Sequence, residues 1–143
     1  YKVEWDDAVV SDFFTQQAML VHDESDPMSR SRIQLSHLDV ARDYAASELP
    51  VHLGRADHAE LIINDPRVSR LHARGEWRNG GFMLVDLSSV GTWIRFAGSE
   101  TDVPLRREDC MLHGSGEIAL GVPLGDLSAP TVTFTVVTGQ TLR

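Results

Sequence analysis

Apolar and polar residues alternate along most of the chain from residue 32 onward, and this period of two is typical of β-strands that bury one face. The alternation begins with Ile33 and Leu35 in RIQLS and is clearest in TVTFTVV, residues 131–137. Further segments with strand character are LPVHLGR, ELIIND, LHARGEW, FMLVDL, TWIRF and EIALG. Short strands separated by turns about every eight to twelve residues predict an all-β sandwich or barrel.

The segment LHARGEW, residues 71–77, gives the strongest local prediction. Its residues are expected to alternate between two faces, with Leu71, Ala73 and Trp77 on one and His72, Arg74 and Glu76 on the other. The following RNGG supplies asparagine and glycine, which tolerate positive φ. We therefore expect a β-hairpin that leads into FMLVDL.

The beginning of the chain has a different character. Between Asp6 and Ser29 there are six acidic residues and no lysine or arginine, which is typical of an extension or interdomain linker. Within it, Val9, Phe13 and Phe14 have the spacing of a short amphipathic helix, and YKVEW ahead of it resembles a short strand. The pattern predicts an acidic extension over residues 1–29, a β-domain over 30–138 and a tail over 139–143.

Composition and charge narrow the classes of partner. The 143 residues carry a net charge of -8, which is a poor match to nucleic acid, and no apolar run approaches the roughly 20 residues of a membrane-spanning helix. The single cysteine, Cys110, excludes an internal disulfide and fits a reducing compartment, so we expect a cytoplasmic location. Residues 51–108 nevertheless hold eight bases to eight acids, which indicates a local site.

Three fragments place polar residues where predicted strands end: LGR at 53–55, VSRLH at 68–72 and DLSSVGT at 86–92. The loops at one end of a β-sandwich cluster in space, so these fragments are expected to converge. A guanidinium, a hydroxyl and backbone N–H groups at short range are what a phosphate dianion requires. The residues have the composition of a site for a negatively charged ligand.

The segments GRADHAELIINDPRVSRLHARGEW and LVDLSSVGTWI closely resemble the forkhead-associated (FHA) domain. The pattern of that family is GR, then SxxH, then serine or threonine followed by NGT. The resemblance implies an eleven-stranded β-sandwich whose loops bind phosphothreonine peptides without a cofactor. The implied partner is a phosphothreonine-containing protein or a phosphosite in the protein's own parent chain.

The resemblance assigns roles residue by residue. Arg55 and Ser69 match phosphate-binding positions, Arg70 matches a further polar contact, and Ser89 matches a loop residue that supports phosphate or peptide. Four positions match structural roles in the family: Gly54, His72, Gly91 and Thr92. Val90 departs from the pattern, since the family has an asparagine there whose amide contacts the ligand's main chain.

Other interpretations of these residues stay open. Arg55 could be a solvated arginine at a strand end, Ser69 could cap the turn that follows DPRV, and Val90 favours a phosphate-independent module for association or dimerisation. Catalysis by Ser69, His72 and Asp86 is disfavoured because there is no nucleophile-elbow sequence. The remaining histidines show no metal-ligand spacing, so neither a metal site nor an enzyme is expected.

A second resemblance concerns the flanks of the motif. YKVEW together with TWIRFAGSETDVPLRREDCMLHGSGEIALG is similar to the carboxy-terminal region of bacterial proteins that join a class III adenylate/guanylate cyclase domain to an FHA domain. This resemblance implies a regulatory or adaptor module of a larger signalling protein. Any nucleotide chemistry would then belong to a domain outside this chain, because the sequence holds no cyclase motif.

Overall fold

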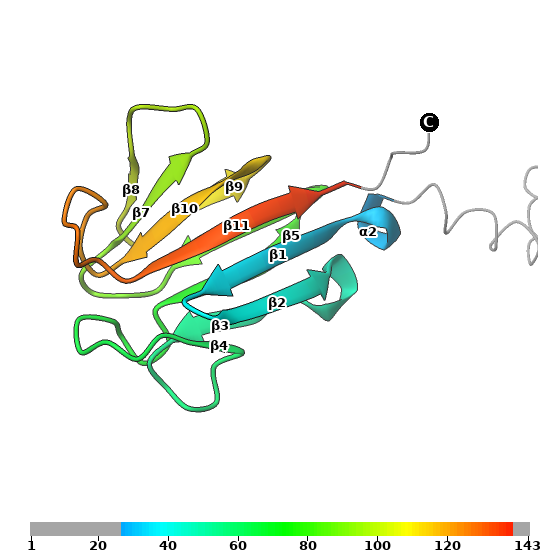
Figure 1. The fold of residues 1–143 in the computed structure, drawn as a ribbon. Helices are drawn as coiled ribbons and strands as arrows, with labels where there is room; N and C mark the ends of the chain where they lie inside the picture. Colours follow the sequence, from blue (N-terminus) through cyan, green and yellow to red (C-terminus); the bar gives the residue numbers. More distant parts are fainter. Residues whose placement is uncertain (1–26, 139–143) are drawn as a thin grey trace, which may run out of the picture.

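The computed structural model describes residues 27–138, which form a sandwich of two β-sheets (Figure 1). The predictions of a strand at YKVEW, an amphipathic helix around Phe13 and Phe14, the acidic residues before Pro27 and the tail at 139–143 lie outside these described residues. The prediction of an all-β sandwich is confirmed.

Eleven strands are present in the described residues. The six-stranded sheet has the order β2-β1-β11-β10-β7-β8 and the five-stranded sheet has the order β4-β3-β5-β6-β9. In chain order the elements are α2 (Pro27–Arg30), β1 (Arg32–His37), β2 (Val40–Ala45), the 3-10 helix η1 (Ala46–Glu48), β3 (Val51–Gly54), β4 (Leu61–Ile62), β5 (Ala73–Arg78), β6 (Gly81–Asp86), β7 (Thr92–Phe96), β8 (Val103–Leu105), β9 (Asp109–Leu112), β10 (Ser115–Leu120) and β11 (Thr131–Val137). Neighbouring strands pair antiparallel except β3 and β4, which are parallel.

The core lies between the two sheets and follows from the alternation in the sequence. Ile33 and Leu35 of β1 pair with Val136 and Phe134 of β11, and Leu35 and Phe134 are both buried. Because strand residues alternate between faces, each inner face presents one row of apolar side chains to the other sheet. The largest fully buried members are Leu53, Leu61, Ile63, Val68, Leu84, Ile94, Ile118, Leu120, Val132 and Phe134.

The hairpin predicted at RNGG joins β5 to β6. Asn79 and Gly80 have φ of 57° and 78°, and Arg78 pairs with Gly81, so these two residues form the whole turn. Both positive angles match the twist of the flanking strands. For residues 71–77, the predicted assignment of side chains to two faces is wrong at His72. The strand β5 begins only at Ala73, and His72, which precedes it, is completely buried rather than exposed on the outer face.

Three edge strands have no clear signal in the sequence. β2 is exposed along most of its length, β8 has three residues and includes a proline, and β9 has only one buried residue. An edge strand buries little surface, so the apolar alternation that reveals an inner strand is weak or absent there. Each of these edge strands is positioned by its pairing with an inner strand: β2 with β1, β8 with β7 and β9 with β6.

The described segment begins and ends at the same end of the sandwich, around α2 and the end of β11 (Figure 1). Met28 of α2, inside the stretch assigned to the extension, packs against the core. The loops that follow β3 and β6 and precede β5 and β7 lie at the opposite end (Figure 1). In residues 27–138, no helix is long and apolar enough to cross a membrane.

Candidate functional site

The first two of the three polar fragments are joined by backbone hydrogen bonds beyond the end of β3. The amide of Arg55 donates to the carbonyl of Ser69 at 3.0 Å, and the amide of Ala56 donates to the carbonyl of Arg70 at 3.0 Å. The amide of His72 closes the same ladder on the carbonyl of Leu53 at 2.8 Å. The main chains of residues 53–56 and 69–72 are thus held side by side.

This close approach explains the glycine before Arg55. A Cβ atom on Gly54 would collide with the carbonyl oxygen of Arg70 and lie 2.9 Å from the amide nitrogen of His72. Any side chain would therefore push the two segments apart. The structural role that the resemblance gave to Gly54 has this physical basis.

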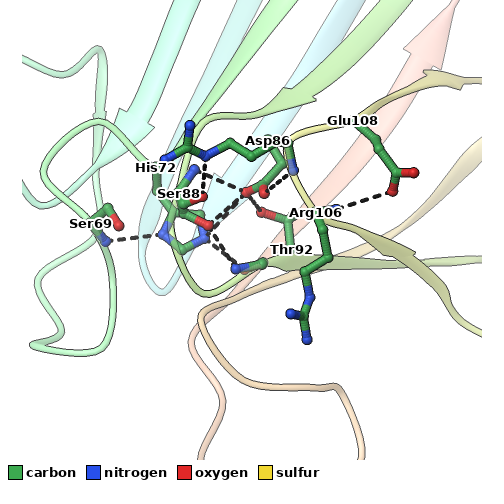
Figure 2. Close-up of polar contacts among 9 residues, drawn as sticks. Ser69, His72, Asp86, Ser88, Thr92, Arg106 and Glu108 are labelled. Atoms are coloured by element: carbon green, nitrogen blue, oxygen red, sulfur yellow. Dashed lines mark hydrogen bonds and ion pairs between the residues drawn. The ribbon is translucent and has the colours of Figure 1, made fainter.

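His72 connects the second fragment to the third. The Ser69 amide donates to His72 Nδ1 at 3.0 Å, and His72 Nε2 lies 2.9 Å from the carbonyl oxygen of Gly91 (Figure 2). Because Nδ1 accepts, the proton of the neutral imidazole is on Nε2, which donates to Gly91. One completely buried ring thus fixes both loops.

The protonation state of His72 follows from its surroundings. Burial lowers the pKa of the imidazole below its ordinary 6.5, and this effect outweighs the hydrogen bond to Gly91 and the charge of Asp86, which both raise it. A proton on Nδ1 would break the hydrogen bond from the Ser69 amide. The neutral ring is therefore the form that holds the loop.

Asp86, at the end of β6, is the centre of a buried polar network (Figure 2). Its Oδ1 accepts hydrogen bonds from Thr92 Oγ1 at 2.7 Å and Ser88 Oγ at 2.8 Å, and its Oδ2 accepts one from the Arg107 amide at 2.9 Å. Burial alone would raise the pKa of the carboxyl, but these hydrogen bonds together lower it below 3.8. Asp86 is thus a buried carboxylate with its acceptor sites occupied.

The same network shapes the turn at residues 88–91. Ser88 Oγ accepts from the Gly91 amide at 2.7 Å, and Arg107 Nε donates to the Ser88 carbonyl at 2.7 Å. Gly91 has φ of 111°, a conformation that side chains disfavour. Ser89 and Val90 are left at the exposed tip, where 42% of the Val90 surface is open to solvent.

The residues assigned to phosphate lie on the outer side of these loops. Arg55 is exposed and uses Nε to donate to the Val68 carbonyl at 2.9 Å, which fixes the guanidinium over the turn that contains Ser69. The Ser69 hydroxyl and the Arg70 guanidinium make no hydrogen bond to another described residue. The remaining N–H groups of Arg55, the Arg70 guanidinium and the Ser69 hydroxyl are therefore available to contact an anion.

Two other arginines of the same stretch already have carboxylate partners. Arg67 forms a two-pronged contact with Asp65 and also bonds Ser128 in the β10–β11 loop. The hydrogen bonds from Arg67 lower the pKa of Asp65 to about 2. Arg74 donates through Nε to one carboxylate oxygen of Glu76. These two side chains stabilise the loop and strand rather than extend the free positive surface.

The contacts of Ser69 and His72 do not form a nucleophile and its base. The hydrogen bond between these two residues comes from the Ser69 backbone amide, and the other ring nitrogen is used by Gly91. A nucleophilic serine requires its hydroxyl to reach the base. Within residues 27–138, no group of three or more His, Cys, Asp or Glu side chains could hold a metal ion.

Sequence reasoning missed the importance of Asp86, Ser88 and Arg107. From the sequence, Asp86 is named only as a member of a disfavoured catalytic triad, and a role is assigned to the exposed Ser89 but none to the buried Ser88. A signal was present in the hairpin: a two-residue turn at Asn79-Gly80 pairs Ala73 with Asp86, so the inward facing of Ala73 turns Asp86 inward as well. An acid at an inward position indicates a buried hydrogen-bonding role.

Comparison with known proteins agrees with this geometry. The family model for the FHA domain matches residues 51–121. A curated relative, the chloroplastic zeaxanthin epoxidase of Nicotiana plumbaginifolia, is 35% identical over 74 residues, which are 48% of this chain and 11% of the relative. The chain therefore spans only about a tenth of that enzyme.

Solved structures share the fold at low sequence identity. The FHA1 domain of yeast Rad53 has a TM-score of 0.60 at 19% identity, with 86% of this chain and 89% of that one covered. The MEK1 FHA domain in complex with the HOP1 pThr318 peptide has a TM-score of 0.53 at 19% identity, covering 73% and 95%. The sequence match over residues 51–121 and the shared two-sheet sandwich show that the chain contains an FHA domain.

Proposed function

We propose that the loop end of the sandwich binds phosphothreonine in a peptide segment, with Arg55, Ser69 and Arg70 contacting the phosphate. The observation that carries this proposal is the arrangement around His72. A fully bonded buried network fixes the loops, while the outer guanidinium and hydroxyl groups keep their hydrogen-bonding capacity. A phosphate dianion is the ligand that matches those donors, and a preformed site avoids ordering costs on binding.

The turn at residues 88–91 is the proposed contact for the peptide flanking the phosphothreonine. Ser89 and Val90 form its exposed tip, while Gly91 and Thr92 belong to the fixed base. The complex of the related MEK1 domain with a phosphothreonine peptide supports this class of ligand. Valine offers no side-chain hydrogen bond, so we expect weak dependence on the main chain of the ligand at this tip.

A second candidate function is phosphate-independent association, favoured by the exposed apolar side chain of Val90. In that case Val90 would pack against an apolar partner surface, and the arginines would only surround the contact. The two functions differ in one measurable property. Binding at Arg55 and Ser69 requires the phosphate, whereas association through Val90 is indifferent to it.

A screen of the whole chain against a phosphothreonine peptide library, paired with the same peptides unphosphorylated, tests the proposal. We expect binding only to phosphorylated members, and we expect inorganic phosphate to compete. Equal binding to both forms would favour the association module. Self-association that persists at saturating phosphate would do the same.

We further propose that the domain is a regulatory or adaptor module of a larger cytoplasmic signalling protein, with residues 1–29 as a connecting extension and 139–143 as a tail. The flanking segments support a parent of the bacterial class III cyclase type. The phosphothreonine would belong to a partner or to the parent chain itself. Sequencing the gene upstream of Tyr1 tests the parent: a cyclase domain is expected, and a different domain would contradict it.

A further inference from the structure

We propose that Arg106, in the connection between β8 and β9, selects peptides that carry an acidic side chain near the phosphothreonine. This inference rests on the proposed function and names a specificity determinant for the same site. Neither the FHA pattern in the sequence nor the set of residues assigned to phosphate includes Arg106.

Arg106 lies against the turn that bears Ser89 and Val90. Its Nε is 3.1 Å from the point where a Cβ on Gly91 would lie, so the missing side chain of Gly91 makes room for it. The guanidinium carbon is 5.9 Å from the centre of the Trp93 ring, a cation–π distance. The turn and the tryptophan thus place a cation beside the exposed tip.

The charge of Arg106 has no carboxylate partner among the described residues. The nearby Glu108 carboxylate binds the backbone of Arg106 and not its guanidinium: Glu108 Oε1 accepts from the Arg106 amide at 3.2 Å. Figure 2 shows the guanidinium directed away from Glu108 and from the buried network. By contrast, Arg32, Arg78 and Arg95 each contact an aspartate.

Arginines without carboxylate partners gather at this end of the molecule. Arg55 and Arg70 lie on the side assigned to phosphate, and Arg106 lies on the far side of the 88–91 turn. Arg107 is also near, but its Nε is bonded to the Ser88 carbonyl and holds the turn. In a chain of net charge -8, arginines without carboxylate partners at one end favour an acidic ligand there.

The valine at position 90 increases the expected contribution of Arg106 to peptide binding. A peptide anchored by its phosphate at Arg55 and passing the tip of the turn receives no side-chain hydrogen bond from valine. The Arg106 guanidinium lies beside the same turn and has no hydrogen-bond acceptor among the described residues, so its N–H groups are available to the peptide. A carboxylate on the passing peptide is the group that this donor binds.

The experiment compares phosphothreonine peptides in which aspartate or alanine occupies each flanking position in turn. Each is titrated by fluorescence anisotropy against the whole chain, Arg106→Gln and Arg42→Gln. Arg42 is a matched control because it is exposed, has no carboxylate partner in the described residues, and lies on β2, at the opposite edge of the sheet from β8.

We expect aspartate at one or two positions on one side of the phosphothreonine to tighten binding about two- to fivefold, as a solvent-exposed ion pair does. Arg106→Gln should remove that preference and leave the alanine peptides unchanged, whereas Arg42→Gln should retain it. Raising the salt concentration should weaken the preference in the unmodified chain.

A preference that persists in Arg106→Gln would overturn the inference, as would aspartate having no effect at any position. In both results, tight phosphorylation-dependent binding would leave the proposed function intact. If no phosphopeptide binds the unmodified chain, the proposed function itself fails and the specificity falls with it.

Discussion

The loop end contains two layers of polar residues that differ in how their hydrogen bonds are used. In the inner layer, Asp86, Ser88, Thr92 and His72 are buried and bonded to one another or to the backbone. In the outer layer, the Ser69 hydroxyl and the Arg70 guanidinium are bonded to no described residue, and Arg55 uses only its Nε, on the Val68 carbonyl. Buried polar groups are costly when unpaired, whereas exposed ones are satisfied by water until a ligand replaces it.

This difference separates stability from binding. Changes to the inner layer should alter the free energy of unfolding and affect binding through loop order, whereas changes to the outer layer should alter affinity and leave unfolding nearly unchanged. Ser69 joins the two layers, since its amide donates to His72 while its hydroxyl, bonded to no described residue, is assigned to the proposed ligand. The predictions below test whether the separation holds.

The largest effect is expected from Asp86→Ala. The substitution leaves the Thr92 hydroxyl, the Ser88 hydroxyl and the Arg107 amide without their acceptor in a buried site. Each buried donor left without its acceptor costs about 1–3 kcal/mol, so the loss of three should lower the free energy of unfolding by at least about 3 kcal/mol. Urea unfolding measures it, with Asp57→Ala as the control because the Asp57 side chain is 98% exposed. Equal stability of the two variants would contradict the network.

A smaller loss of stability is expected for His72→Ala. Its removal leaves the Ser69 amide and the Gly91 carbonyl unpaired, which costs roughly 1–3 kcal/mol. The melting temperature should fall more than in His58→Ala, whose ring is largely exposed. A normal melting curve combined with loss of phosphopeptide binding would instead identify His72 as a ligand-contacting residue.

The pKa shifts of the inner layer predict how stability changes with pH. The pKa of His72 is lowered in the folded chain, so the unfolded chain takes up a proton first as the pH falls below about 6.5, and stability decreases from there. The lowered pKa of Asp86 adds a further loss as the pH falls below 3.8 and through its folded value. Unfolding curves between pH 7.5 and 5 should show the first decrease, and His72→Ala should reduce it. If stability decreases equally in the unmodified chain and in His72→Ala, His72 is not the cause of the decrease.

The smallest effect concerns the exposed tip. Val90→Asn supplies one hydrogen-bonding amide, and one neutral hydrogen bond contributes roughly 0.5–1.5 kcal/mol, or about two- to tenfold in affinity. Calorimetry should show this gain for a phosphothreonine peptide and none for its unphosphorylated form. Unchanged affinity for the phosphopeptide would favour the association module.

The sequence predicted the inner strands because they depend on local alternation, and it predicted the convergence of the three loops because loops at one end of a β-sandwich cluster. Alternation in β1 and β11 and the Asn79-Gly80 turn are visible without the fold. The edge strands and the place of His72 were not predictable in the same way. Their positions depend on pairing with distant strands and on the loop at Gly91, which lies nineteen residues away in the chain.

The candidate site shows the same division. Arg55 and Ser69 were found through a spaced motif, whereas Arg107 carries no motif and its role arises from a contact with Ser88. Such contacts between the β6–β7 and β8–β9 connections appear only when the sheets are assembled. The exception is Asp86, whose inward phase follows from its pairing with Ala73 in the predicted hairpin.

The most direct test of the account is calorimetry of Arg55→Ala with a phosphothreonine peptide that binds the unmodified chain, beside the urea unfolding of the same variant. A charge-assisted hydrogen bond contributes about 1.5–3 kcal/mol, so affinity should fall roughly tenfold to more than a hundredfold, while loss of the hydrogen bond to the Val68 carbonyl should move the unfolding midpoint only slightly. Arg42→Ala should change neither. Unchanged affinity in a folded Arg55→Ala variant would contradict the assignment of the outer layer to phosphate.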